Sequence, residues 1–293
     1  MTDYLLGIDA GGTKTKARLV SVATGEQWQF RDGPASLTND RPGAIKRVIA
    51  VSNELIGRAA IKPQQVSMVC GIAGANHEVA RLKLQDKVAE LGLAKFSVIS
   101  DSIISVYGAG YGKPMLCVAV GTGSVAVLLN GAGDTQQFGG WGFTAGDQGS
   151  GADLGRKLVR GGLDRFDAGD YLDDPLYRAL FDEIGQSSEE IMAWLNSAKV
   201  TDYARLMHVL QRFPEHERVK ELLAYAGKAT SRLIEIGLAH ESVPVALMGG
   251  MANYISDYIA KDFRSALVEP EGDALDGALW LAAQNLKQVA QDD

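Results

Sequence analysis

The sequence has few cysteines and few histidines, which limits its metal and redox chemistry. Only Cys70 and Cys117 occur among the 293 residues, and each lies inside a predicted strand. A buried, inert thiol is the role that we expect for both. A zinc site needs more closely spaced Cys or His ligands, and no pair of the four histidines has that spacing.

Long hydrophobic runs are also missing. No stretch of about 18 apolar residues could span a bilayer, and the first residues do not combine a basic and an apolar segment as a signal peptide does. These absences lead us to expect a cytoplasmic protein that does not bind membranes.

An excess of positive charge is the third absence. The formal net charge is -7 and the isoelectric point is about 5.2. Such a chain has no general attraction for nucleic acid, so a small soluble ligand is expected instead. An anionic ligand such as ATP would need a local positive site or a divalent cation.

Glycine, in contrast, is abundant, and two glycine-rich stretches organise the chain. The first, residues 9–15 (Asp-Ala-Gly-Gly-Thr-Lys-Thr), lies between an apolar run and a run of alternating residues. Alternation after the glycines predicts a strand-turn-strand hairpin. A Walker loop and a dinucleotide-binding turn are excluded, because both open a helix.

The second stretch, residues 121–124 (Gly-Thr-Gly-Ser), lies between two similar apolar runs. Glycine lets bare backbone approach an anion, and consecutive N–H groups with a Thr or Ser hydroxyl can then bind phosphate. An ordinary hairpin turn is the alternative for either stretch alone. The repetition favours phosphate binding.

The repetition extends to whole domains, since a third strand follows each hairpin and a Gly- and Pro-rich boundary lies at residues 108–114. A chain of this length and ordinary globular composition can form two domains. In the first half we predict strands at 4–8, 16–20, 27–30, 66–72 and 96–100, and helices at 43–60, 78–91 and 102–109. In the second half we predict a helix at 150–159, mostly helix at 173–240, a strand at 243–248 and helices from about 253 and in the C-terminal segment.

Two acidic residues stand where such folds bind ligands. Asp101 ends a strand of the α/β pattern, although it could equally cap the following helix. Asp147 lies in the glycine-rich segment 138–152, just before a helix, and could likewise be only a capping residue. The many glycines of this segment favour close approach to a ligand, or a hinge, over a merely flexible loop.

An ordered set of motifs resembles the sugar kinase, heat-shock protein 70 and actin superfamily. Residues 9–14 resemble its first phosphate loop, residues 121–124 its second, and residues 247–251 (Leu-Met-Gly-Gly-Met) its adenosine loop. Within that superfamily the chain is similar to the N-acetylglucosamine kinase and glucosamine kinase branch, which shares sequence with the BadF/BadG/BcrA/BcrD ATPases. The specific matches are Gly-Gly-Trp-Gly at 139–142, Gly-Asp-Gln-Gly-Ser-Gly at 146–151 and Asp-Ala-Leu-Asp-Gly-Ala at 273–278.

The resemblance implies an α/β fold of two ribonuclease-H-like, actin-like ATPase domains facing each other across a nucleotide cleft. We place the first domain at residues 1–112 plus the C-terminal helix 276–293, and the second at 113–275 with a helical insertion. The resemblance also implies ATP and Mg2+ as cofactors, an amino sugar as the substrate, and a homodimer. The motifs do not distinguish N-acetylglucosamine from glucosamine.

The resemblance also implies roles for individual residues. Asp101 would be the general base that accepts the proton of the sugar O6 hydroxyl as this oxygen attacks the γ-phosphate. Asp9 would hold Mg2+ through water. The expected ATP-binding residues are Gly11, Gly12, Thr13, Lys14, Gly121, Thr122, Gly123, Gly249 and Gly250. The expected sugar-binding residues are Asn39, Asp101, Gly140, Trp141 and Asp147.

Three other functions compete with a kinase. An ATP-driven activator of a dehydratase or reductase would share an iron-sulfur cluster through loop cysteines, whereas the two cysteines here are expected in mid-strand. A sugar-binding regulator would carry a helix-turn-helix segment ahead of the first phosphate loop, and we expect none before Asp9. A structural, actin-like role would leave the segment around Asp147 unexplained.

Overall fold

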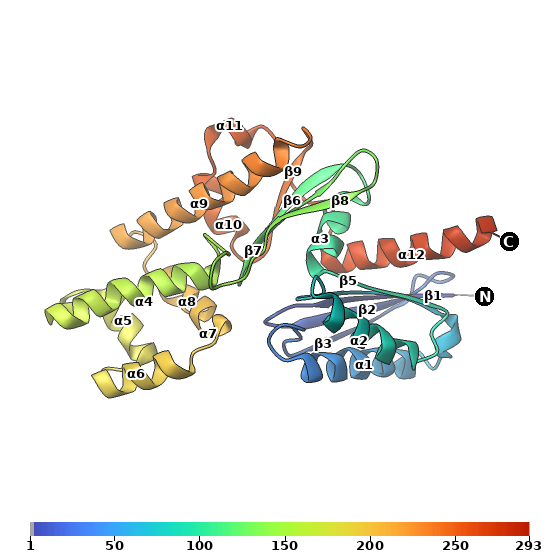
Figure 1. The fold of residues 1–293 in the computed structure, drawn as a ribbon, viewed down its shortest axis with the longest axis horizontal. Coiled ribbons are helices and arrows are strands. Elements are labelled where there is room, and N and C mark those ends of the chain that lie inside the picture. Colours follow the sequence, from blue (N-terminus) through green and yellow to red (C-terminus); the bar gives the residue numbers. More distant parts are fainter. Residues whose placement is uncertain (1–2, 293) are drawn as a thin grey trace. The chain divides into compact units, whose positions relative to one another are not determined.

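The computed structural model describes residues 3–292, with side chains as far as residue 285, and shows an α/β fold with two five-stranded sheets (Figure 1). The chain divides into two compact units. Unit 1 comprises Met1–Cys117, Val127–Gln136 and Val268–Asp293, and unit 2 comprises Val118–Ala126 and Gln137–Leu267. The domain boundaries at 112/113 and 275/276 stay a prediction, and residues 1, 2 and 293 lie outside the described residues.

The sheet of unit 1 has the strand order β3-β2-β1-β4-β5. Its strands are β1 (Tyr4–Ala10), β2 (Thr15–Ser21), β3 (Gln27–Asp32), β4 (Val66–Ile72) and β5 (Lys95–Ile99). Strand β1 pairs antiparallel with β2 and parallel with β4, and β4 pairs parallel with β5. The carboxyl ends of β1, β4 and β5 therefore meet at one edge of the sheet.

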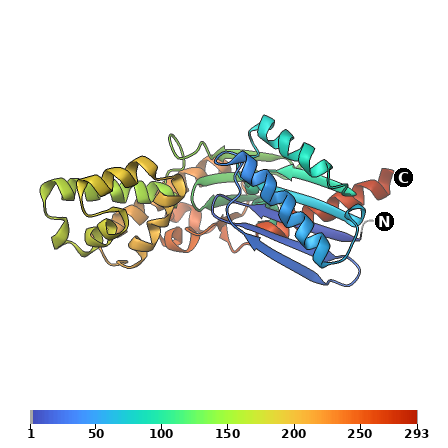
Figure 2. The ribbon, with the colours of Figure 1, turned by 90° about the horizontal axis from the view of Figure 1, so that it is seen from below.

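Helices cover both faces of this sheet (Figure 2). Helices α1 (Arg41–Arg58) and α2 (Glu78–Ala89) pack on one face, and α3 (Asp101–Gly110) and α12 (Ala274–Asp292) pack on the other. All seven residues of β4 are buried because this central strand has helices on both sides. The strand predicted at 66–72 is confirmed with the same bounds.

Helices α3 and α12 approach so closely that glycine is required at the contact. A Cβ atom on Gly108 would overlap with the backbone oxygen of Asp273, and one on Gly277 would overlap with the backbone oxygen of Ile104. Beside this contact the rings of Tyr107 and Trp280 stack with centroids 5.2 Å apart. The small residues of the C-terminal motif thus let α12 pack against α3.

The second sheet has the order β10-β9-β6-β7-β8. Read from β8, it repeats the order of the first sheet: third, second, first, fourth and fifth strand of its half. Its strands are β6 (Met115–Val120), β7 (Ser124–Leu129), β8 (Thr135–Gly139), β9 (Val245–Met248) and β10 (Leu267–Val268). The duplication that the two glycine hairpins predict is thereby confirmed in the strand order. The two-residue strand β10 was not predicted.

Unit 2 is otherwise helical. Its helices are α4 (Gly151–Ala168), α5 (Pro175–Ile184), α6 (Ser188–Ser197), α7 (Val200–Arg205), α8 (Met207–Gln211), α9 (Glu217–Leu238), α10 (Ala252–Ile255) and α11 (Lys261–Arg264), with short 3-10 turns at Tyr171–Asp173 and Ser256–Tyr258. The predicted end of α4 at residue 159 is wrong. The helix continues because Gly162 packs tightly on α5, where a Cβ would lie 2.5 Å from Leu180. Helix α4 ends before Gly169, its C-cap residue, which has φ +77°.

Both cysteines are buried inside strands, as predicted. Burial raises the pKa of the Cys117 thiol to about 12 and that of Cys70 higher still, so neither forms a thiolate near neutral pH. Among the described residues, none of the helices combines the length and the hydrophobicity that crossing a bilayer requires.

The α3–α12 contact predicts the effect of two alanine substitutions. We expect Gly108→Ala to lower the free energy of unfolding by about 1–3 kcal/mol, because a methyl group would collide with the carbonyl group of Asp273, directly before α12. Gly57→Ala is the matched control, since Gly57 is an exposed helical glycine with open space at its Cβ, and alanine there should raise stability by about 0.5–1 kcal/mol. Urea unfolding measures both, and a Gly108→Ala variant as stable as the parent would contradict the packing described.

Candidate active site

The carboxyl edge of the first sheet brings Asp9 and Asp101 into one neighbourhood. Asp9, near the end of β1, is the register partner of Gly71 on β4, and Gly71 is the partner of Ile99 on β5. Asp101 follows Ile99 by two residues and opens α3. A Cβ on Gly71 would overlap with Ile104, so this glycine lets α3 lie against β4.

The protonation of Asp9 depends on its burial and on the nearby Asp101. Burial, and next the carboxylate of Asp101, raise the pKa of Asp9 from its ordinary 3.8 to about 6, although Lys16 opposes the shift. Lys16 is the cross-strand partner of Asp9 and also lies 3.7 Å from a carboxylate oxygen of Asp273. A carboxyl pair of this kind holds unfavourable charge that a cation would relieve.

Asp101 is not the capping residue of its helix. Ser100 occupies the N-cap position of α3, and the Asp101 carboxylate accepts hydrogen bonds from the backbone N–H of Ser102 at 3.0 Å and the hydroxyl of Ser100 at 3.3 Å. Burial raises the pKa of Asp101, while these hydrogen bonds lower it. The carboxylate therefore lies just past a strand end with a raised proton affinity.

The loop that carries Asn39 is tied to the same edge. The backbone N–H of Leu37 donates to Ala73 O at 2.9 Å, just past the end of β4, and the N–H of Ala35 donates to Gly11 O at 2.9 Å, just past β1. Asn39 itself is exposed. Unit 1 thus holds Asn39, Asp9 and Asp101 on segments that meet at one end of the sheet.

The first glycine hairpin is closed by a hydrogen bond from Gly11 N–H to Lys14 O at 3.0 Å. Thr13 and Lys14 are exposed at its tip. Neither Gly11 nor Gly12 has a positive φ, and a Cβ on Gly12 would meet nothing within 4 Å among the described residues. Backbone geometry and packing therefore both permit a side chain at Gly12, so the fold itself does not require glycine there.

The second hairpin, at Gly121–Gly123 in unit 2, is closed by a hydrogen bond from Gly121 N–H to Gly123 O at 2.8 Å. The first turn of α4 rests on it, because the N–H of Gly151 donates to Gly121 O at 2.8 Å and that of Ala152 donates to Thr122 O at 3.3 Å. Gly121, like Gly12, has open space at its Cβ. Backbone N–H groups and a threonine hydroxyl can bind phosphate there.

Asp147 lies against this second hairpin. Its carboxylate accepts a hydrogen bond from Ser124 N–H at 3.2 Å, and a Cβ on Gly123 would lie 2.8 Å from one of its oxygens. Burial raises the pKa of Asp147, and the Ser124 hydrogen bond lowers it. Gly140, with φ +70°, donates its N–H to Ser124 O at 3.1 Å, and the neighbouring Trp141 is 83% exposed.

The Gly249-Gly250 turn, which follows β9, lies against Val120 at the start of the second hairpin. Gly249 has φ +92°, and a Cβ on it would overlap with the Val120 carbonyl, so the fold requires this glycine. Gly250 has open space at its Cβ, and the N–H of Met251 donates to Val120 O at 3.0 Å. The turn between β6 and β7 therefore gathers the ATP-binding and sugar-binding residues that the sequence predicts in unit 2.

Asp153, Arg156 and Lys16 were not predicted, although all three belong to these neighbourhoods. Asp153 could have been found from its spacing, since an acid three residues after Ser150 is the pattern of a helix N-terminus. Lys16 could have been found from the hairpin register, which places it opposite Asp9.

Among the described residues, no group of three or more His, Cys, Asp or Glu side chains could hold a metal ion, so a cation at Asp9 would keep water or ligand oxygens as its other ligands.

Comparison with known proteins agrees with this architecture. The chain is 28% identical over 295 residues to the glucosamine kinase GspK of Vibrio cholerae, with 99% of each chain covered. It is 26% identical over 276 residues to an N-acetylmuramic acid/N-acetylglucosamine kinase of Clostridium acetobutylicum, with 90% of each chain covered. The crystal structure of a Chromobacterium violaceum protein assigned as an N-acetylglucosamine kinase superposes with a TM-score of 0.88 at 28% identity, covering 96% of this chain and 99% of that one.

The fold of two ribonuclease-H-like domains is thus confirmed by the strand orders and by this structural similarity. The BadF/BadG/BcrA/BcrD ATPase family model matches residues 6–168, which is more than half of the chain and includes both glycine hairpins, Asp101 and Asp147. The protein belongs to the BadF/BadG/BcrA/BcrD ATPase family.

Proposed function

We propose that this protein is an ATP-dependent kinase that phosphorylates N-acetylglucosamine or glucosamine at the O6 hydroxyl. The observation that carries the proposal is the carboxyl pair of unit 1, in which Asp101 has a raised pKa and Asp9 lies beside it at the strand ends. The kinases named among its relatives support an amino sugar as the acceptor.

Asp101 would act as the general base. Phosphoryl transfer depends mostly on in-line positioning and on neutralising charge, so one well-placed carboxylate is sufficient to accept the proton of the attacking hydroxyl. The raised pKa of Asp101 favours that acceptance. Asn39, Gly140, Trp141 and Asp147 would bind the sugar, with the exposed indole of Trp141 as an apolar wall.

Asp9 would hold Mg2+. The raised pKa of its carboxyl group, caused by burial and by Asp101 and opposed by Lys16, fits a site where a cation would stabilise the ionised form. The ion would neutralise charge on the ATP phosphates. The phosphates would be bound by Gly11, Gly12, Thr13 and Lys14 of the first hairpin and by Gly121, Thr122 and Gly123 of the second, and Gly249 and Gly250 would bind the adenosine.

An activator with an iron-sulfur cluster is less well supported. Cys70 and Cys117 are buried within strands, whereas a shared cluster needs thiolates that reach a surface. A visible spectrum and iron analysis of anaerobically purified protein test this alternative, and a bound cluster would overturn the kinase proposal. The homodimer and the cytoplasmic location that the family resemblance implies stay predictions.

A coupled ADP-release assay tests the proposal directly. We expect glucosamine or N-acetylglucosamine to stimulate ADP release more than glucose or N-acetylmannosamine. Asp101→Asn should lower kcat by roughly 10²–10⁴-fold, because the base is removed while the shape is kept. Asp86→Asn, an exposed acid on α2, is the matched control and should retain activity. Full activity in Asp101→Asn would show that Asp101 is not the base, and no stimulation by any sugar would refute the kinase function.

Gly12→Ala and Gly250→Ala test the glycines that the fold does not require. Both have open space at the Cβ position, so we expect the melting temperature to stay near that of the parent. The added methyl groups would face bound ATP, and the KM for ATP should rise roughly tenfold, about 1.4 kcal/mol of lost binding. Gly57→Ala again serves as the control, and an unchanged KM for ATP in both variants would count against nucleotide binding at these turns.

Asp9→Asn tests how much the ionisation of Asp9 lowers the stability of the folded protein. Its folded-state pKa of about 6 lies above 3.8, so the stability contributed by this group is complete at pH below 3.8 and is lost as the pH rises through 6. The variant should therefore be more stable than the parent at pH 8, by up to about 3 kcal/mol, and equally stable at pH 3.5 to 4. Thermal unfolding across pH measures the difference. If Asp9 holds the metal, Mg2+ with ATP should stabilise the parent more than the variant.

A further inference from the structure

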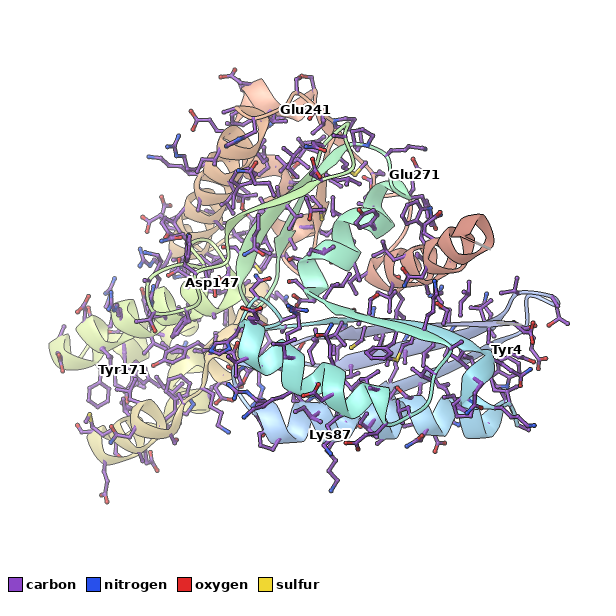
Figure 3. The ribbon with its side chains drawn as sticks, turned by 45° about the vertical axis from the view of Figure 1, so that its right-hand side comes forward. Tyr4, Lys87, Asp147, Tyr171, Glu241 and Glu271 are labelled. Carbon is purple, nitrogen blue, oxygen red and sulfur yellow. The ribbon has the colours of Figure 1, made fainter. Side chains whose placement is uncertain are left out.

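The segment 140–150 of unit 2 joins β8 to α4 and carries the proposed sugar-binding residues Trp141 and Asp147. Figure 3 shows Asp147 on this segment, beside the start of α4. Asp147 has φ +57°, a left-handed conformation that is uncommon for a residue other than glycine. Such a conformation persists only where the surroundings fix it. The segment must therefore be held by contacts outside Asp147.

Asp153, in the first turn of α4, supplies the first of these contacts. Its carboxylate is 1% exposed and accepts a hydrogen bond from Gly149 N–H at 3.0 Å, two residues after Asp147. Gly149 also lies against α9, where a Cβ would be 3.0 Å from Ala226. Because Asp153 is so deeply buried, it acts on the segment and not on a ligand.

Arg156 extends the contact to the other part of the segment. One guanidinium nitrogen donates to the second carboxylate oxygen of Asp153 at 2.8 Å, and another donates to Phe143 O at 3.2 Å. The guanidinium also lies over the Phe143 ring, 4.8 Å from its centroid. The Asp153–Arg156 pair thus fastens the segment at Phe143 and at Gly149, on either side of Asp147.

Tyr225 of α9 completes the set of donors around Asp153. Burial, and next the hydrogen bond to Asp153, raise the pKa of Tyr225 to about 12, so its hydroxyl remains a donor throughout the working pH range. The Asp153 carboxylate therefore accepts hydrogen bonds from Gly149, Arg156 and Tyr225. A buried carboxylate with a paired guanidinium and further donors is a satisfied group.

We propose that Asp153 and Arg156 are positioning residues that preset Asp147 and Trp141 for the sugar. The inference rests on the proposed function, because the ligand of Asp147 is taken to be the sugar. It adds two residues whose role is to hold the segment in place. Their loss should weaken sugar binding and leave the phosphoryl-transfer step intact, since Asp101 lies in another unit.

The chemistry of both side chains is specific. An asparagine at 153 would replace one acceptor oxygen with an NH2 group that faces a donor, and would leave the Arg156 charge without its partner. A lysine at 156 could not reach Asp153 and Phe143 O at once, because it lacks the planar fork of the guanidinium. Conservative substitutions should therefore disturb the segment.

Steady-state kinetics of Asp153→Asn test the proposal. We expect the KM for the amino sugar to rise roughly tenfold, while kcat changes less than about twofold. Asp164→Asn, the same substitution at an exposed position of α4, is the matched control and should behave like the parent. Parent-like kinetics with a lowered melting temperature would show a merely structural role and overturn the proposal.

A double variant tests whether Asp153 acts through Asp147. If it does, Asp147→Ala combined with Asp153→Asn should show the same KM for the sugar as Asp147→Ala alone. A KM that is raised by the product of the two single effects would mean that the residues act independently, and would overturn the proposal. Should Asp153→Asn fail to fold, Arg156→Lys replaces it in both measurements.

Hydrogen exchange separates this proposal from the proposed function. Amides of residues 141–149 should exchange faster in Asp153→Asn and Arg156→Lys than in the parent and in Asp164→Asn, whether or not any sugar is a substrate. Faster exchange without sugar-stimulated ADP release in the parent would refute the kinase function alone. Unchanged exchange in these variants would refute the positioning role.

Discussion

Two carboxyl groups crowded at the end of a buried sheet form the constraint on which unit 1 is built. Burial raises the proton affinity of a carboxylate and a second carboxylate nearby adds to the effect, and these two causes, burial first, raise the pKa of Asp9 to about 6. The register of β1, β4 and β5, the glycine at position 71 and the packing of α3 all serve to bring Asp101 to that edge. The site is thus prepared for a ligand that carries positive charge or a proton.

Unit 2 presents a different chemistry at the corresponding turn. Asp9 has no acidic equivalent before Gly121, where Val120 ends the strand. The turn instead offers backbone N–H groups, held by the first residues of α4 and by the turn after β9. The first turn therefore has an acid at its strand end, and the second has none. This division suits a reaction that needs both a base and an anion-binding turn.

Local patterns in the sequence predicted the strands and the hairpins well. The period-two alternation of β2 and the apolar run of β4 are local signals, and both strands formed as expected. The full length of α4 could not be predicted, because Gly161 and Gly162 look like helix breakers until α5 is seen to pack on them. Tertiary packing overrides local propensity at that point. The identity of Asp101 and Asp147 as candidate site residues followed from the motifs, but the network of Asp153, Arg156 and Tyr225 depends on α9, far along the chain.

The close packing of α12 on α3 has a consequence for how the protein is made. Residues of α12 complete the core beside Val69 and Ile104, and the hydroxyl of Ser67 donates to Ala282 O at 2.9 Å across 215 positions of sequence. During synthesis, the part of this face that α12 covers, beside α3, therefore stays exposed until α12 has been made. Exposed apolar surface of that kind invites aggregation while it lasts. Because unit 1 also includes Val127–Gln136 and the segment from Val268 onward, the first unit to emerge is the last to be completed.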